Sequence, residues 1–411
     1  MASFLSYVPV LNRFIAGSGS PEQVFDIPPP DVHDTETSPD RRARCLKHLL
    51  KANHATFAVI YHNLEFDNHN PHILSSAYLL GASEDQLRNI YEKEVEDLEP
   101  WAESPGEVGE DDWTEYLGDR RYQRAYVDYF EDQLVMRFSY DWKKLLEHYM
   151  FHDKHRLVYG LFGGLGHPLI HLGYAYEMNC KEIAIDALTM GAVQHNYLHK
   201  YLEYPKYTRP SPFTTHSISD LLGRLRGDKR FDGIFKRPGL KNFDELFEKH
   251  EDLLLEYWNA WEISDPVKQF EECQEVATSL LVATVPPGTH SYNFFFAHAL
   301  TTTHALRVLL PLIPTKYQLT LVRGWLLYTL AIYISFLRPE IDPDYIDPST
   351  LKGRHWSYVE NAALTSTWAT DAHYVKALRA IEVAARTWGD VHERYLAAAV
   401  RLADDFHGWT F

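Results

Sequence analysis

Histidines within apolar helical segments are the residues of this sequence best suited to chemistry. The chain holds 22 histidines in 411 residues, and a subset of them has hydrophobic neighbours on both sides. A polar imidazole is costly in such surroundings unless it is hydrogen-bonded or bound to another group. The subset comprises His69, His72, His167, His171, His195, His199, His298, His304 and His373, the last of which is followed by Lys376.

The spacing inside these segments can bring two polar groups to one helix face. Residues three or four positions apart lie on the same side of a helix. This spacing is found in the pairs His69 and His72, His167 and His171, and His373 and Lys376. In a further segment His298, Thr301 and His304 follow one another at three-residue steps. Four such helices that converge in a bundle would form a metal site with supporting groups around it.

The residues alone leave the identity of the metal open. Neutral imidazole suits iron, copper, nickel and zinc, while oxygen chemistry requires a redox-active ion with an open position. The sequence has no His-Glu-x-x-His motif, no structural Cys/His site and no paired Glu-x-x-His motif. Gly160–Gly166 lacks the order of a nucleotide-binding loop and follows no strand. Two simpler interpretations also stay open: the histidines are ordinary core residues, and His195 and His199 flank a surface that ends at Lys200.

Helical periodicity predicts the elements that position these residues. Apolar residues recur at the helical period in Arg124–Leu134, Pro168–Tyr176, Lys181–Leu202, Pro266–Val282, Asn293–Leu310, Trp356–Trp368 and Ala372–Trp388. The four residues from Ser83 resemble a capping box, and Asp265 precedes a proline at a first helical position. Proline clusters between these segments predict short connections. We therefore expect an all-α fold, with residues 1–411 forming one large bundle-like domain.

Charge and cysteine content exclude several classes of partner. The formal net charge of −17 would repel a phosphate backbone, so we expect no nucleic-acid partner. Three widely spaced cysteines fit a reducing compartment, and Met1–Gly17 lacks the basic start of a signal peptide, so we expect a cytoplasmic location. Leu319–Leu337 is long and apolar but carries Arg323 and Gly324. It is predicted to be a buried core helix and not a membrane span.

Together the histidine segments resemble the questin oxidase-like family, fungal enzymes of aromatic polyketide and anthraquinone metabolism. The resemblance runs through most of the chain and rests on His69–Ser83, Gly166–Glu177, the stretch from Glu182, His298–Pro311 and Asp371–Ala380. It implies oxidative carbon–carbon cleavage of an anthraquinone-type ring in secondary metabolism, either by Baeyer–Villiger oxidation or by iron-dependent dioxygenation. The absence of a flavin motif favours the iron version.

On this basis the sequence predicts a specific centre. Iron(II) is expected to be bound by His72, His171, His298 and His373, with Lys376 as a further ligand. The expected supporting groups are His69, His167, Thr301 and His304, with Lys376, Thr301 and His304 acting in catalysis. Exchanges inside a pair, such as His167 for His171, are compatible with the spacing. At Asp67 the sequence departs from the histidine that we expect in the family, which favours His72 over His69.

Lys376 has three possible roles, because an ammonium group cannot coordinate a cation. Burial can lower its pKa so that the neutral amine acts as a base, or carbon dioxide can convert it to a carbamate ligand. Alternatively, its side chain can extend to the surface as an ordinary lysine. Among the functional roles the carbamate is preferred, because it would supply the anionic ligand that an all-histidine site lacks.

The expected substrates are an aromatic polyketide and dioxygen, with Tyr292 and Phe294–Phe296 as candidate aromatic walls. Two other functions stay open. One is a metal-free or NADPH-assisted Baeyer–Villiger monooxygenase in which buried histidines act as acid and base. The other is a non-catalytic helical binding protein whose histidines are structural.

Overall fold

The fold is all-α, as the sequence predicts. A computed structural model describes residues 24–152 and 154–411; Met1–Gly17 lies outside this part of the chain. The α-helices are α1 (Arg41–Thr56), α2 (Asn70–Leu79), α3 (Glu84–Glu94), α4 (Gln123–Met136), α5 (Trp142–Glu147), α6 (His167–Glu177), α7 (Lys181–Val193), α8 (His199–Glu203), α9 (Ile218–Gly227), α10 (Lys241–Lys249), α11 (Glu251–Ala260), α12 (Pro266–Val282), α13 (Phe294–Leu309), α14 (Thr315–Ser335), α15 (Trp356–Thr365), α16 (Ala372–Trp388) and α17 (Arg394–Asp405).

The strands are only two residues long. β1 (Ile60–Tyr61) pairs antiparallel with β2 (Phe66–Asp67), and β3 (Tyr292–Asn293) pairs parallel with β4 (Trp409–Thr410). Each pairing ties a short segment to the start of a helix: β2 ends three residues before α2, and β3 leads directly into α13. These ladders therefore position helix ends and form no layer of their own.

Helix starts follow the sequence signals closely. Ser83 and Gln86 form the capping box at the start of α3, and the side chain of Asp265 accepts a hydrogen bond from the Lys268 amide at the start of α12. One helix prediction was wrong: Lys181–Leu202 is divided into α7 and α8. The chain leaves the helix at Gln194, whose side chain donates to the buried Asp67 carboxylate. A tertiary contact thus overrides the apolar periodicity there.

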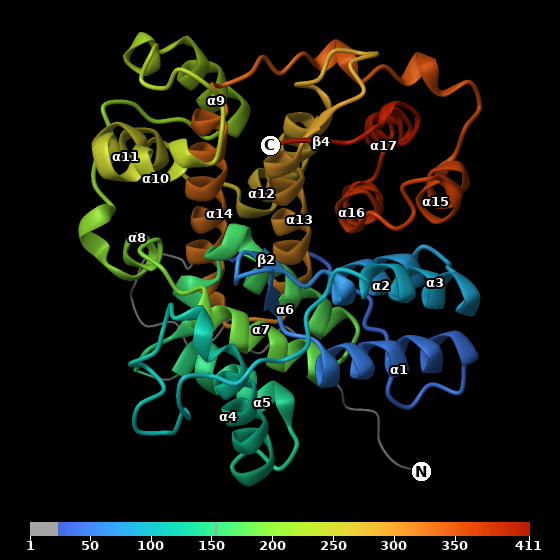
Figure 1. Ribbon diagram of the computed structural model, residues 1–411. Helices are drawn as coiled ribbons and strands as arrows, with labels where there is room; N and C mark the ends of the chain where they lie inside the picture. Colours follow the sequence, from blue (N-terminus) through green and yellow to red (C-terminus); the bar gives the residue numbers. More distant parts are fainter. Residues whose placement is uncertain (1–23, 153) are drawn as a thin grey trace, which may run out of the picture.

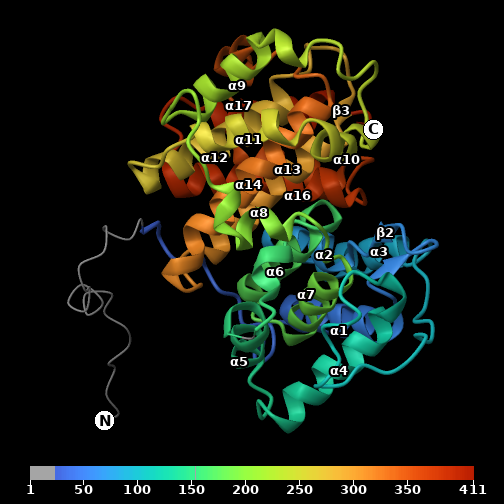
Figure 2. The same cartoon turned by 90° about the vertical axis from the view of Figure 1, so that its left-hand side faces the viewer.

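The two halves of the sequence meet around the helices that carry the histidines. Figure 2 shows α9–α17 gathered above α1–α7, and Figure 1 shows α13 at the centre with α16 beside it. Helix α13 packs on α6, α12, α14 and α16, and α16 also packs on α2. Helix α14 is buried along most of its length, and among the described residues no helix is long and apolar enough to cross a membrane.

A buried ion pair between α1 and α7, extended by a carboxylate on α4, lies beneath this junction. His54 on α1 is 7% exposed, and its Nδ1 lies 2.7 Å from Asp186 Oδ1 while its Nε2 lies 3.2 Å from Glu131 Oε1. Burial opposes a charge on the ring, but the carboxylates of Asp186 and Glu131 outweigh this effect and raise the pKa of His54 to about 10. The folded protein therefore holds His54 as an imidazolium.

Replacing His54 by glutamine is expected to lower the free energy of unfolding by about 3 kcal/mol near pH 6, because Asp186 loses its buried partner. The folded pKa lies above the unfolded value, so this stabilisation is complete below the unfolded pKa and is lost as the pH rises through about 10. The gap between wild type and His54→Gln in urea unfolding should thus narrow from pH 6 to pH 10. His48→Gln, at an exposed position of the same helix, is the control. A gap that is constant with pH would contradict the ion pair.

Candidate metal centre

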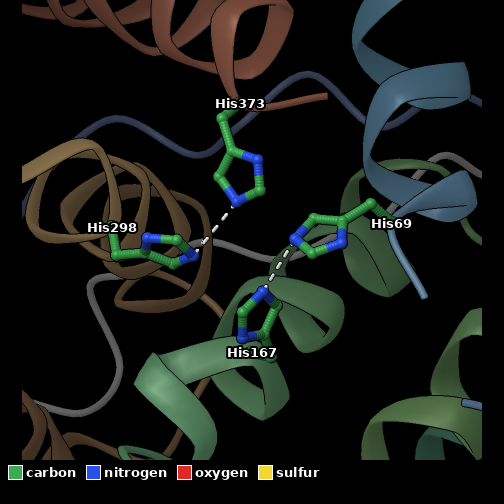
Figure 3. A group of neighbouring side chains, drawn as sticks. All are labelled: His69, His167, His298 and His373. Atoms are coloured by element: carbon green, nitrogen blue, oxygen red, sulfur yellow. Dashed lines mark hydrogen bonds between the residues drawn. The ribbon is translucent and has the colours of Figure 1, made fainter. Parts of the chain in front are cut away.

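Four imidazoles from distant parts of the chain meet in the interior. His69, His167, His298 and His373 each offer one ring nitrogen, and these four atoms all lie within 4.8 Å of one another. Figure 3 shows the rings pointing toward a common point. The Nε2 atoms of His69 and His167 are 2.9 Å apart, and those of His298 and His373 are 3.2 Å apart. A single cation between these nitrogens could be bound by all four.

Helix starts aim three of these side chains inward. His69 is the N-cap of α2, His167 is the first residue of α6 and His373 is the second residue of α16. A proline in the first turn fixes the beginning of both α2 and α6, where its missing amide costs nothing. The positive end of a helix dipole disfavours an imidazolium. The position of these histidines at helix N-termini therefore favours neutral rings, which can bind a metal.

The glycine-rich loop before α6 positions His167. Gly164 and Gly166 have φ of +51° and +80°, a conformation that side chains rarely adopt. A Cβ on Gly164 would lie 1.7 Å from Gln194 Oε1, and one on Gly166 would lie 2.5 Å from Thr302 Cγ2. Gly160–Gly166, the stretch without the order of a nucleotide-binding loop, thus contains a tight turn that packs against Gln194 and α13.

The tautomers of the rings follow from their second nitrogen. Nδ1 of His69 lies 2.6 Å from the Asp67 carbonyl, Nδ1 of His167 lies 2.6 Å from the Gly164 carbonyl, and Nδ1 of His298 lies 2.9 Å from the Phe294 carbonyl. A carbonyl oxygen only accepts, so each Nδ1 must carry the proton. Each Nε2 then presents a lone pair to the centre of the group. For His69 and His167, the lone pairs of the two Nε2 atoms face each other across 2.9 Å.

Burial keeps the four rings uncharged. It holds the pKa of each ring well below the usual range, and the neighbouring Lys376 lowers these pKa values further. A proton shared between the facing nitrogens would create a buried imidazolium, which is costly. Asp67 Oδ2 lies 3.1 Å from His167 Nδ1 and can orient this ring, although burial raises the pKa of Asp67 to about 7. A bound cation would relieve the facing lone pairs.

The other predicted ligands, His72 and His171, lie immediately behind this group. His72 Nε2 is 2.7 Å from His171 Nδ1, so these rings contact each other and not the common centre. The His72 ring stacks on His167 at 5.9 Å and on Tyr174 at 5.2 Å. Of the four histidines predicted as ligands, the structure brings together His298 and His373, and it joins them to the partners His69 and His167 of the other two pairs.

Thr301 and His304 lie away from the group. The Thr301 hydroxyl donates to the Ala297 carbonyl within α13, at 3.0 Å. His304 Nε2 is 2.9 Å from Arg379, which also donates to the buried carboxylate of Glu177. Desolvation opposes ionisation of Glu177, yet Arg379 and His304 hold its pKa well below the usual range. This cluster joins α6, α13 and α16 behind the imidazoles.

Lys376 is buried beside the group and does not reach the surface. It is 1% exposed, and among the described residues its Nζ has no hydrogen-bond partner. Burial lowers the pKa of Lys376 to about 7, against the opposing effect of the Asp371, Asp67 and Glu94 carboxylates. A lone ammonium at this position would be poorly stabilised. The site therefore favours a neutral or chemically modified lysine.

Only one of the predicted aromatic wall residues faces the imidazoles. Tyr292, Phe295 and Phe296 are core residues with at most 5% exposure, whereas Phe294 is partly exposed and lies 4.3 Å from the His373 ring and 4.7 Å from the His298 ring. The sequence interpretation missed Trp409 and Phe411, which contact Phe294. No local pattern marks them, because their position depends on the pairing of β3 with β4.

The remaining histidine pair and the surface cavities lie elsewhere. The rings of His195 and His199 contact each other at a tilt near α8, with their centroids 4.4 Å apart. Cavities of about 590 and 640 Å³ are lined mainly by α9, α12 and the 340–346 connection, and by the region between α8 and α11. None of the four grouped histidines lines either cavity.

Known proteins are similar to this chain over most of its length. The family model described as questin oxidase-like matches residues 66–381, which include all four grouped histidines. A Baeyer-Villiger oxidase of Emericella nidulans is 22% identical over 84% of this chain and 82% of its own length. Baeyer-Villiger oxidases of Pestalotiopsis microspora and Pestalotiopsis fici are 22% and 21% identical, over 85% and 81% of this chain and 83% and 79% of their own lengths.

Proposed function

The chain belongs to the questin oxidase-like family and is an oxidoreductase, and from this premise we propose that it is an iron-dependent oxygenase that cleaves a ring of an anthraquinone-type aromatic polyketide. The proposed ligands are His69, His167, His298 and His373, with Lys376 contributing as a carbamate. The relatives named Baeyer-Villiger oxidases support oxygen chemistry. We further propose a cytoplasmic location for the enzyme.

The facing lone pairs of His69 and His167 carry the metal proposal. A cation bound by both Nε2 atoms would account for the approach of two neutral imidazoles, fixed as Nδ1–H tautomers, to 2.9 Å. An all-imidazole set suits iron, copper, nickel or zinc, and reaction with dioxygen selects a redox-active member of this series. Bound iron(II) would supply the electrons that a closed-shell aromatic cannot readily give to dioxygen in one step.

The residues of the chain prepare the site for this chemistry. The carbonyls of Asp67, Gly164 and Phe294 hold three of the rings in their binding tautomer, and the Asp67 carboxylate orients His167 further. The His72 ring packs against His167, and Tyr174 packs against His72. The burial of His167 and His298 limits the access of bulk water to the group, which would disfavour side reactions.

A Baeyer–Villiger monooxygenase without a metal is the second candidate function, and the names of the relatives favour it. In that reaction one oxygen atom enters the product and the other leaves as water, with two electrons from NADPH or a hydroquinone substrate. Neutral buried imidazoles could then act as acid and base. A dioxygenase instead places both atoms in the product and needs no external reductant.

Metal analysis separates the two candidates. We expect purified protein to contain about one iron per chain and to lose turnover of an anthraquinone-type substrate when iron is removed by a chelator under anaerobic conditions. Turnover should return on addition of iron(II) but not of zinc. Incorporation of two labelled atoms from ¹⁸O₂ supports the dioxygenase. Full turnover by metal-free protein would reject the iron proposal.

A further inference from the structure

The segment Trp409–Phe411 lies at the start of the helix that carries His298. Trp409 and Thr410 pair with Tyr292 and Asn293, and the Thr410 hydroxyl donates to the Tyr292 carbonyl at 3.2 Å. Asn293 is the N-cap of α13, where its side chain accepts from two backbone amides. The ladder therefore fixes the position of Trp409–Phe411 relative to Phe294, the first residue of α13.

Trp409 also connects the segment to the helix that carries His373. Its Nε1 donates to Asp371 Oδ2 at 2.9 Å, and Asp371 caps α16 by accepting from the Tyr374 amide at 2.8 Å. The Trp409 ring lies 6.1 Å from the His373 ring and packs at 4.7 Å against Phe406. The segment is thus attached to the starts of both α13 and α16, the helices that carry His298 and His373.

Aromatic rings extend from the imidazoles to the surface through Phe294. The Phe294 ring lies 4.3 Å from His373 and 4.8 Å from Phe411. Phe411 is 73% exposed, although a phenylalanine at the surface leaves a large apolar area in water. His373 itself is 9% exposed. An apolar path of rings therefore leads from solvent to one of the proposed ligands.

We infer that Phe294, Trp409 and Phe411 form the wall on which the substrate stacks, and that Phe411 selects fused multi-ring aromatics over single rings. This inference rests on the proposed function for the reacting ring at the imidazoles. A single ring held there reaches Phe294 at most, whereas a fused tricyclic also covers Phe411, which lies one ring further out. Offset stacking on Phe411 adds binding energy only for the larger ligand.

Binding to the metal-free full-length chain tests the wall without requiring turnover. The probes are 1,8-dihydroxyanthraquinone and catechol, followed by quenching of tryptophan fluorescence. Phe411→Ala is expected to weaken binding of the tricyclic probe by about tenfold and that of catechol by less than about twofold. Phe411→Trp should retain binding of the tricyclic probe. Met136→Ala removes a side chain that is 83% exposed on α4 and serves as the control.

Two outcomes would overturn the inference: an unchanged dissociation constant of the tricyclic probe in Phe411→Ala, or an equal loss for both probes. In the iron-loaded enzyme, Phe411→Ala should raise KM for the tricyclic substrate about tenfold while kcat stays within about twofold. Absence of iron from the wild type would refute the proposed function, yet the probe titration would still decide on the wall. The melting temperature of each variant shows that it is folded.

Discussion

Replacing His69 or His167 by glutamine is expected to abolish iron binding, whereas replacing His72 or His171 in the same way should leave the iron in place. Glutamine keeps a polar side chain of similar length but offers no imidazole nitrogen. Turnover in the first two variants should fall by more than about 100-fold, because even partners that only orient a metal ligand cost 10–100-fold. The expected loss follows from the nitrogen positions, because His69 and His167 share a centre with His298 and His373, whereas His72 and His171 do not belong to that group.

The measurement is iron content per chain by elemental analysis, together with turnover and the melting temperature. His72→Gln and His171→Gln are matched controls, because both residues are fully buried and lie one helical turn or less from the residues that they control for. The opposite result, iron lost with His72 and His171 and kept with His69 and His167, would show that the ligand set predicted from the sequence is correct. Retention of iron in all four variants would place the metal elsewhere.

Much of the fold could be predicted because local signals determine it. The prediction for Pro266–Val282 coincides with α12 and that for Ala372–Trp388 with α16, since an N-cap aspartate opens each helix. Prediction failed at Gln194, where a hydrogen bond to Asp67 ends α7. That bond joins residues 127 positions apart, and no local pattern contains this information.

The candidate site shows the same division between local and tertiary information. Helical spacing identified the histidine pairs, but a pair on one face does not determine which member reaches the centre. His69 is the N-cap of α2 and His167 is the first residue of α6, whereas His72 and His171 lie further along these helices, and helical spacing alone does not distinguish the two positions. His304 lies on the expected helix but contacts Arg379, which belongs to α16. The choice inside each pair therefore depends on helix packing.

Replacing Lys376 by methionine is expected to reduce turnover by more than about 100-fold while the protein stays folded. Methionine fills a similar volume and removes a buried amine that has no hydrogen-bond partner among the described residues, so stability should not fall. If the neutral amine adds carbon dioxide, one carbamate forms and one proton is released, and the centre gains an anionic oxygen ligand beside its four neutral imidazoles. Loss of this ligand should weaken iron binding about 10–100-fold.

If Lys376 acts as a carbamate ligand, another carboxylate at this position should restore part of the turnover. If Lys376 acts as a base, a carboxylate should not do so. We expect Lys376→Glu to bind iron more tightly than Lys376→Met, and propionate to raise the turnover of Lys376→Ala. Removal of bicarbonate and carbon dioxide should lower the activity of wild type but not that of Lys376→Glu. Carbamates are easily lost in intact mass spectrometry, so ¹³C NMR after incubation with labelled bicarbonate is the direct measurement.

Wild-type activity that does not depend on bicarbonate, with no rescue by glutamate or propionate, would instead assign Lys376 the role of a neutral base. This assignment is chemically coherent, because burial lowers the pKa of Lys376 to about 7 and leaves much of the amine unprotonated near neutral pH.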